Sequence, residues 1–221
     1  MVEAIVLTLQ LASLTTLILL IVGVPLGFWL ARDTGIIASV VSALVALPLV
    51  LPPTVLGFYL LIGLGPNGPL APMLAATGIR TLAFSFPGLV IGSVLFSLPF
   101  MVQPARNGFA GVGREAFEAA ATLRAGPLDS FFSVALPLAR GGVVTGAILS
   151  FAHTIGEFGV VLMIGGNIPG ETRVLSIAIF DAVEQGDWGA AHQMSAGLLA
   201  FAFVVILTTT LIEKRAGGRA R

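Results

Sequence analysis

Long apolar runs alternate along this chain with short polar segments. No charged residue occurs between Glu3 and Arg32, and none occurs between Asp33 and Arg80. An apolar run of about 20 residues is long enough to cross the hydrocarbon core of a bilayer as a helix. The pattern therefore predicts five spanning helices, which cover residues 4–31, 36–64, 84–105, 137–164 and 191–212.

Three features modify this simple pattern. Residues 66–82 are rich in Pro and Gly and predict a loop. Residues 172–184 predict a shorter amphipathic helix that lies at the membrane interface or re-enters the membrane. The second predicted span also contains three prolines, Pro48, Pro52 and Pro53. The fold class expected is an all-α integral membrane protein with one transmembrane domain over residues 1–221.

The composition agrees with a membrane protein and leaves no room for a separate soluble domain. Hydrophobic residues make up 57% of the chain and charged residues only 10%, whereas soluble domains average about 25% charged residues. The absence of Cys excludes disulfides, iron–sulfur clusters and thiolate zinc sites. The first apolar run is too long for a signal peptide and begins without Lys or Arg, so we expect a retained helix.

The distribution of basic residues predicts the orientation in the membrane. Five crossings place the termini on opposite sides, and basic residues gather in cytoplasmic loops. One predicted side holds only Arg80 and Arg173. The other side holds the remaining nine of the eleven, namely Arg32, Arg106, Arg114, Arg124, Arg140, Lys214, Arg215, Arg219 and Arg221. We therefore expect an external N-terminus, a cytoplasmic C-terminus and a cytoplasmic loop over residues 106–136.

That loop is the longest polar segment between spans, and its sequence predicts two short helices. Residues 114–125 are dense in Ala and Glu, which favour helix. Gly126-Pro127 ends this helix and can begin another. Ala119 and Ala120 have little bulk, so another surface can approach closely, while Glu115, Glu118 and Arg124 can orient it. The alternative is a solvated helix that lies on its own membrane spans.

Glu118-Ala119-Ala120, followed by Val134-Ala135-Leu136-Pro137, resembles the EAA signature of permease subunits in ATP-binding-cassette (ABC) importers. The resemblance implies a type I ABC importer permease fold, in which this loop forms the coupling helix that sits in a cleft of the ATPase subunit. The chain departs from the family at one position. Arg124 stands where the family usually has Gly, and we expect Gly126 to provide the turn instead.

Further segments narrow the resemblance to molybdate permeases. They are residues 47–57 (LPLVLPPTVLG), 156–159 (GEFG) and 167–173 (NIPGETR). Sulfate permeases share the general plan and some of these elements. The resemblance thus implies molybdate as the substrate, with tungstate close behind and sulfate as the competing oxyanion.

A polar stripe runs along the fourth predicted span. Its members recur at steps of three or four residues, which places them on one face of a helix: Gly142, Gly146, Ser150, His153, Thr154 and Glu157. A carboxylate within a membrane is tolerated only where it faces protein or water, and His153 and Glu157 can pair. We expect this face and the bend at Pro52 and Pro53 to line or gate the pathway. The alternative is a polar contact between helices of one subunit.

The predicted external loop after this span carries further polar residues and turn formers: Asn167, Pro169, Gly170, Glu171 and Arg173. We expect it to gate the pathway or to dock a delivery protein. The alternative is a turn that links two helices.

No catalytic or metal site is predicted. The chain lacks the G-x-x-x-x-G-K-[ST] loop that cradles ATP, and neither His lies in H-E-x-x-H. Energy must therefore come from a partner. The resemblance implies a homodimer of permeases, two cytoplasmic subunits that bind ATP and Mg, and an extracytoplasmic molybdate-binding protein. No cofactor in this chain and no nucleic-acid partner are expected.

Transport by alternating access is the mechanism expected, and two other classes compete with it. A secondary transporter driven by an ion gradient predicts internal repeats, and no convincing repeat is present. An intramembrane enzyme built on His153 and Glu157 needs a nucleophile or more metal ligands than the sequence supplies. The chain is therefore expected to be a non-catalytic multi-pass subunit of a bacterial or archaeal cell membrane.

Overall fold

The computed structural model describes the backbone of residues 1–217 and the side chains of residues 1–211, and the described part is helical with connecting loops. Lys214 and Arg215 have side chains outside this range, and Arg219 and Arg221 lie wholly outside it. The elements are α1 (Val2–Arg32), α2 (Ile36–Ala46), η1 (Leu47–Leu49), α3 (Pro53–Leu64), α4 (Ala71–Ala76), α5 (Phe86–Ala110), α6 (Arg114–Thr122), α7 (Pro127–Asp129), η2 (Ser130–Ala135), α8 (Leu136–Leu138), α9 (Arg140–Gly156), α10 (Gly159–Gly165), α11 (Leu175–Glu184) and α12 (Trp188–Gly217).

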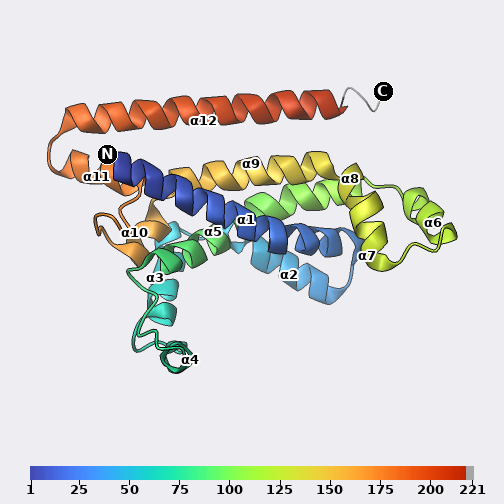
Figure 1. The fold of residues 1–221 in the computed structure, drawn as a ribbon, viewed down its shortest axis with the longest axis horizontal. Helices are drawn as coiled ribbons and strands as arrows, with labels where there is room; N and C mark the ends of the chain where they lie inside the picture. Colours follow the sequence, from blue (N-terminus) through green and yellow to red (C-terminus); the bar gives the residue numbers. More distant parts are fainter. Residues whose placement is uncertain (218–221) are drawn as a thin grey trace.

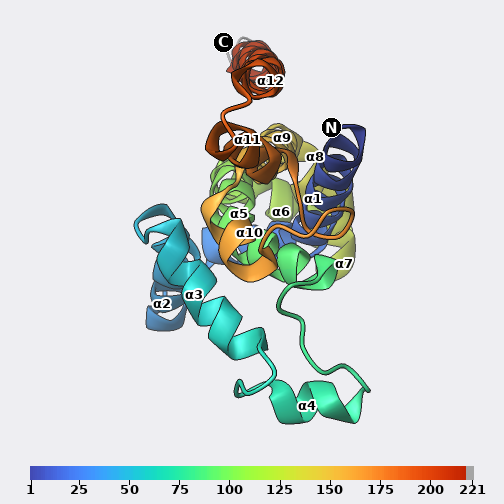
Figure 2. The ribbon, with the colours of Figure 1, turned by 90° about the vertical axis from the view of Figure 1, so that its left-hand side faces the viewer.

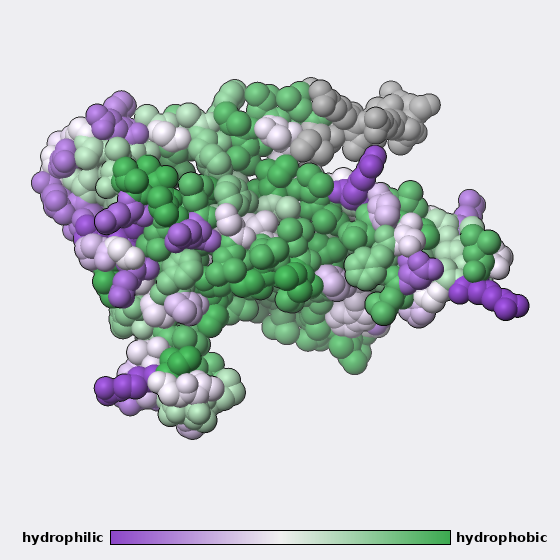
Figure 3. Space-filling view, viewed as in Figure 1, coloured by the Kyte–Doolittle hydropathy of each residue, from purple (hydrophilic) through white to green (hydrophobic). Residues whose placement is uncertain are grey.

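Helices α1, α5, α9 and α12 run along the long axis of the molecule (Figure 1). Three helices, α1, α5 and α12, are each long and apolar enough to cross a membrane, and the count reaches five if each of two bent helix pairs is one span. Apolar residues cover the middle of the face shown in Figure 3, and hydrophilic residues gather toward its two ends. The five predicted membrane segments are therefore present, although two of them are broken.

The predicted span over 36–64 is interrupted, as its three prolines indicate. The chain bends by 109° between Leu49 and Pro53, because proline lacks the N–H donor and its ring clashes with the preceding helical turn. Beyond this break, α3 and α4 extend away from the other helices (Figure 2). The predicted loop 66–82 thus contains the short helix α4.

The prediction of one uninterrupted helix over 137–164 is wrong, because these residues are divided among α8, α9 and α10. A bend of 75° separates residues 127–138 from α9. Helix α9 then ends at Gly156, and Glu157 has extended backbone angles before α10 begins. The predicted amphipathic helix over 172–184 is confirmed as α11, which begins slightly later at Leu175.

Helix α5 lies at the centre of the bundle and is held by glycines of α1 and α9. A methyl group at Gly27 would lie 3.1 Å from the backbone nitrogen of Arg106, and one at Gly142 would lie 2.3 Å from the carbonyl oxygen of Pro104. Glycine therefore allows the helix backbones to approach closely, as small residues do in membrane proteins generally. Buried Leu19, Met101 and Phe109 fill the space beside these contacts.

Helix α12 lies at the edge of the bundle, and few of its residues are buried. An apolar cleft of about 380 Å³ separates it from the start of α1 and includes Ile5, Leu9 and Phe201. A second cleft of about 500 Å³ on its other side includes Ala152 and Ile179. Its position therefore depends on few contacts within the chain.

Substitution of Gly142 tests the close approach of α9 to α5. Gly142→Ala should destabilise the chain by about 1–3 kcal/mol, because the added carbon overlaps backbone atoms that cannot move aside cheaply. Gly197→Ala on α12 is the matched control, since nothing lies within 4 Å of its added carbon. Thermal unfolding in detergent measures both variants, and equal unfolding temperatures would contradict the packing described.

Candidate functional site

The predicted coupling segment forms a separate structure beyond one end of the bundle. Helix α6 lies past the end of α5, and α7, η2 and α8 lead the chain back to α9 (Figure 1). The C-terminal end of α12 lies toward the same end of the molecule, and the N-terminus lies toward the other. This relative arrangement is the one that the basic residues predict, and the cytoplasmic assignment itself stays a prediction.

An aromatic cluster fastens α6 and η2 to the bundle. The ring of Phe28 in α1 lies 5.1 Å from that of Phe109 in α5 and 5.0 Å from that of Phe131 in η2. The Phe28 ring also lies 6.4 Å from that of Phe117 in α6. The guanidinium of Arg32 lies 4.1 Å from the centre of the Phe117 ring, in a cation–π contact. Packed rings therefore connect α6 and η2 to α1 and α5.

Sequence reasoning missed this cluster, although one signal was present. Phe117 lies three residues before Ala120, and this spacing puts both on one face of a helix. Ala120 is buried against the chain's own residues, whereas Ala119 and Glu115 are exposed. Of the two alanines expected to admit a partner, only Ala119 is thus accessible. Glu118 is exposed and pairs with Arg114 at 3.0 Å, a surface pair of small energy.

Helix α6 ends in a Schellman motif with Arg124 at the position that favours glycine. The Ala125 N–H donates to the Ala120 carbonyl at 3.0 Å, and the Arg124 N–H donates to the Ala121 carbonyl at 2.9 Å. Arg124 has φ of +60°, a left-handed conformation that costs an L-residue about 1–2 kcal/mol. The prediction that Gly126 makes the turn is wrong, since Gly126 is extended and precedes α7.

Leu136 and Pro137 form most of the short helix α8. The half-buried Leu136 side chain packs into the same apolar cluster as Phe117 and Phe131, whereas Pro137 is exposed. The Leu-Pro pair therefore stands where the coupling segment bends into α9.

The polar stripe of α9 faces α5 of the same chain. The Ser97 hydroxyl of α5 lies 2.9 Å from His153 Nδ1 and 3.0 Å from the Thr154 hydroxyl, at hydrogen-bonding distance from both. The His153 ring stacks on that of Phe100 at 4.0 Å. Ser150 is fully buried, and its hydroxyl has no hydrogen-bond partner among the described residues. This is the contact that the alternative interpretation expects, and a role in the pathway stays a prediction.

Glu157 is separate from that stripe and lies at the break between α9 and α10. Its carboxylate accepts a hydrogen bond from the Val160 N–H at 2.8 Å, and its carbonyl accepts one from the Ser176 hydroxyl. Glu157 and His153 thus each have other partners and do not pair. The carboxylate of Glu157 thus satisfies one N–H in the first turn of α10, although the N-cap residue of that helix is Phe158.

The two broken spans meet at their breaks. A methyl group at Gly159, the first residue of α10, would lie 2.6 Å from the Pro53 side chain at the start of α3. Pro52 and Pro53 are themselves exposed beside this contact. The structure therefore brings together Pro53 and the segment next to Glu157, which the sequence had named separately. Within the described residues, no cluster of three His, Cys, Asp or Glu side chains offers a metal site.

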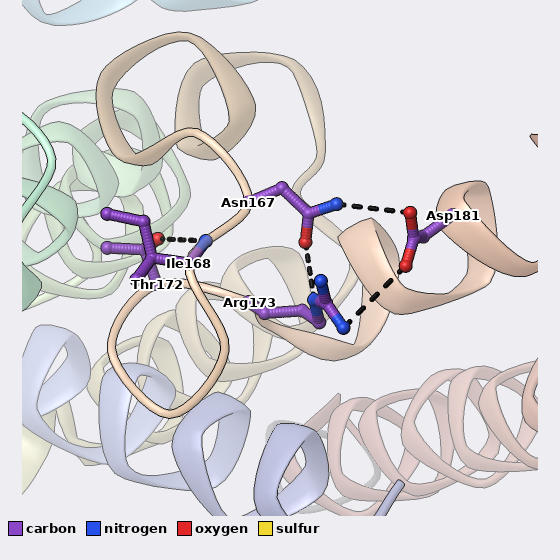
Figure 4. A network of polar contacts seen from close by, with 5 residues as sticks. All are labelled: Asn167, Ile168, Thr172, Arg173 and Asp181. Carbon is purple, nitrogen blue, oxygen red and sulfur yellow. Dashed lines mark hydrogen bonds and ion pairs between the residues drawn. The ribbon is translucent and has the colours of Figure 1, made fainter.

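The predicted external loop is held by a polar network (Figure 4). The Arg173 side chain donates to the Asn167 amide oxygen and lies 3.7 Å from the Asp181 carboxylate, which in turn accepts from the Asn167 amide nitrogen at 3.2 Å. Buried Thr172 bonds to Gly165 and Ile168. Pro169, Gly170 and Glu171 form the exposed tip of the loop. The sequence analysis missed Thr172 and Asp181.

The side chain of Arg106 lies in a cleft of the bundle, near the end that carries α6. The half-buried Arg106 of α5 donates to the Ser42 hydroxyl of α2 at 2.8 Å. Gln103 and Asn107 line the same cleft, which has a volume of about 220 Å³. Its polar groups include several hydrogen-bond donors and no carboxylate.

Comparison with known proteins identifies the fold and family. Residues 23–217 match the model of the binding-protein-dependent transport system inner membrane component. The chain belongs to this family. The ribbon also resembles a chain in the crystal structure of a bacterial alginate ABC transporter in complex with alginate pentasaccharide-bound periplasmic protein, with a TM-score of 0.77 and 17% identity over 97% of this chain and 78% of that one. The fold is therefore that of a type I ABC importer permease.

Two curated family members differ clearly in their similarity to this chain. The molybdenum transport system permease protein ModB of Azotobacter vinelandii is 56% identical over 203 residues, which cover 92% of this chain and 90% of the relative. The sulfate transport system permease protein CysW of Synechococcus elongatus is 29% identical over 99% of this chain and 76% of the relative. The present protein, as a member of the same family, is thus a multi-pass inner-membrane transport protein.

Removal of the Phe28 ring tests how α6 is fastened. Phe28→Ala should loosen α6, because truncation of a packed Phe removes about 3 kcal/mol or more of packing energy. Hydrogen exchange of the α6 amides should then accelerate at least about tenfold. Phe203→Ala, on the exposed face of α12, is the control and should leave that exchange unchanged. Equal protection in both variants would show that α6 is held by other contacts.

Proposed function

We propose that this chain is the permease subunit of an ABC importer that carries molybdate, with tungstate as a close second substrate, into the cytoplasm. The observation that carries the proposal is the 56% identity to a molybdenum permease across nine-tenths of both chains. Sulfate is the second candidate, supported by the weaker similarity to a sulfate permease. Molybdate, tungstate and sulfate are all tetrahedral dianions, so the permease fold alone does not distinguish them.

The assembly proposed contains two copies of this chain, two ATP-binding subunits and an extracytoplasmic binding protein. The N-terminus lies outside and the C-terminus in the cytoplasm, as the basic residues indicate. ATP and Mg are bound by the partner subunits, and this chain carries no cofactor and no catalytic group. The periplasmic protein in the related alginate complex supports a binding protein as the kind of partner.

The mechanism proposed is alternating access driven through α6. When the ATP-binding subunits close, α6 moves with them, and the ring contacts of Phe28 carry this motion to α1 and α5. The contact of Pro53 with Gly159 joins the two broken spans, and it is a suitable place for a gate because helix breaks change angle without unwinding a whole helix. The polar network around Arg173 docks the binding protein or gates the outer mouth.

The cleft at Arg106 supports an anionic substrate. A guanidinium without a carboxylate partner attracts anions, and Ser42 and Asn107 supply further donors. Only weak attraction is useful in a pathway, since tight binding slows release. Selectivity then resides mainly in the binding protein.

Transport in reconstituted vesicles tests the substrate. Vesicles that contain this chain, its ATP-binding subunit and its binding protein should accumulate molybdate with ATP at a rate at least about tenfold above that for sulfate. Omission of the ATP-binding subunit is the control and should abolish uptake. Preferred uptake of sulfate would favour the second candidate, and uptake without that subunit would instead indicate a secondary transporter.

Ala119→Arg tests the coupling role of α6. The substitution places a long side chain on the exposed face of the helix, where it should block the ATP-binding subunit while leaving the fold intact. Stimulation of ATP hydrolysis by loaded binding protein should fall at least about tenfold. Ala121→Arg is the control, because it adds the same charge on the opposite exposed side of α6 and should leave the stimulation of ATP hydrolysis closer to normal. Normal stimulation in Ala119→Arg would refute the proposal that this face of α6 docks the ATP-binding subunit.

A further inference from the structure

Arg124 occupies a backbone conformation that a different residue would adopt more easily. Its φ of +60° is shared by only one other non-glycine residue, Phe84, among the described residues. The carbonyls of Ala120 and Ala121 at the end of α6 accept hydrogen bonds from the backbone N–H groups of Ala125 and Arg124, so the turn requires no arginine side chain. A residue held against its backbone preference commonly serves a function, and the guanidinium is the group that glycine would lack.

The Arg124 side chain has no partner among the side chains of residues 1–211, which the structure describes. It is exposed, and it makes no ion pair or hydrogen bond with the described side chains. The neighbouring cation Arg114 is already paired with Glu118, and Asp129 accepts from the Ser133 hydroxyl at 2.7 Å. Arg124 is thus available to an outside anion.

Two large apolar residues, one on each side, lie close to Arg124 in the sequence. Leu123, at the end of α6, is 83% exposed, and Leu128, in α7, is 75% exposed. Helix α6 lies beyond the end of α5 (Figure 1), away from the long apolar helices whose exposure lipid accounts for. An exposed apolar pair around an arginine is typical of a protein-binding surface, in which Arg and large apolar residues carry much of the energy.

We propose that Arg124 binds a carboxylate of the ATP-binding subunit, while Leu123 and Leu128 pack into an apolar hollow beside it. This inference rests on the proposed function, because it requires that α6 docks such a subunit. A guanidinium forms two parallel hydrogen bonds with a carboxylate, so the contact fixes the orientation of α6 as well as attracting the partner. Electrostatic complementarity of this kind selects one partner over others, and Arg124 therefore determines which ATP-binding subunit this permease accepts.

Three substitutions of Arg124 separate its charge from its backbone conformation. Arg124→Gly and Arg124→Asn remove the charge and favour the left-handed conformation, whereas Arg124→Lys keeps the charge and the strain. At low salt, the dissociation constant for the complex of this chain with the ATP-binding subunit should rise at least about tenfold in Arg124→Gly and Arg124→Asn. The rise should be smaller in Arg124→Lys. The salt dependence of binding should also flatten in Arg124→Gly, while its thermal stability rises or stays equal.

Arg80→Gln is the control, since it removes one positive charge from the loop between α4 and α5, which leads into the end of α5 opposite α6. Wild-type affinity in Arg124→Gly and Arg124→Asn would overturn the inference while leaving the proposed function intact. Failure of the wild-type chain to bind any ATP-binding subunit would instead refute the proposed function. An effect seen only in vesicles of anionic lipid, with unchanged affinity in detergent, would assign Arg124 to phosphate headgroups and would also overturn the inference.

Discussion

The close packing of α5 between α1 and α9 is the constraint on which the other features depend. Lipid provides no hydrophobic driving force between helices, so their association depends on contact area and hydrogen bonds. Gly27 and Gly142 allow backbones to meet where any side chain would separate them. The hydroxyl of Ser97 then finds its partners on α9 at hydrogen-bonding distance. Three helices thus form a rigid unit in which a displacement of α5 also displaces its neighbours.

The aromatic cluster connects this unit to α6 and η2. Phe28 contacts rings from three other elements, and Arg32 caps the ring of Phe117. Packed rings have low compressibility, so force applied to α6 reaches α1 and α5 without being lost in bending of the connection. The segment between Ala110 and Arg114 is too short to act as a loose tether. The family assignment and the geometry therefore support the same direction of coupling.

The sequence predicted the membrane segments and the family, because apolar length and the EAA pattern are local signals, and the coupling role of residues 106–136 stays a prediction. It indicated the interruption of 36–64 at its prolines, but it predicted neither the 109° angle there nor the break in 137–164 after Gly156. The direction taken after Pro53 or Gly156 depends on contacts with distant residues. The aromatic cluster was missed for the same reason, as Phe28 and Phe131 are far apart in the chain. The turn at Arg124 shows a different limit. The glycine usual in the family indicates that position 124 requires a left-handed conformation. Arg124 itself adopts that conformation, and Gly126, which was expected to make the turn, does not.

The position of α12 has a consequence for the membrane around the protein. Residues Trp188–Leu211 form an apolar stretch of about 36 Å at 1.5 Å per residue, which exceeds a hydrocarbon core of about 30 Å. The helix must therefore tilt to match the bilayer, and few internal contacts oppose that tilt. A thinner membrane would increase the angle and widen one of the two apolar clefts beside the helix. The tilt of α12, and with it the width of these clefts, is thus expected to respond to bilayer thickness more than the tightly packed helices α1, α5 and α9 do.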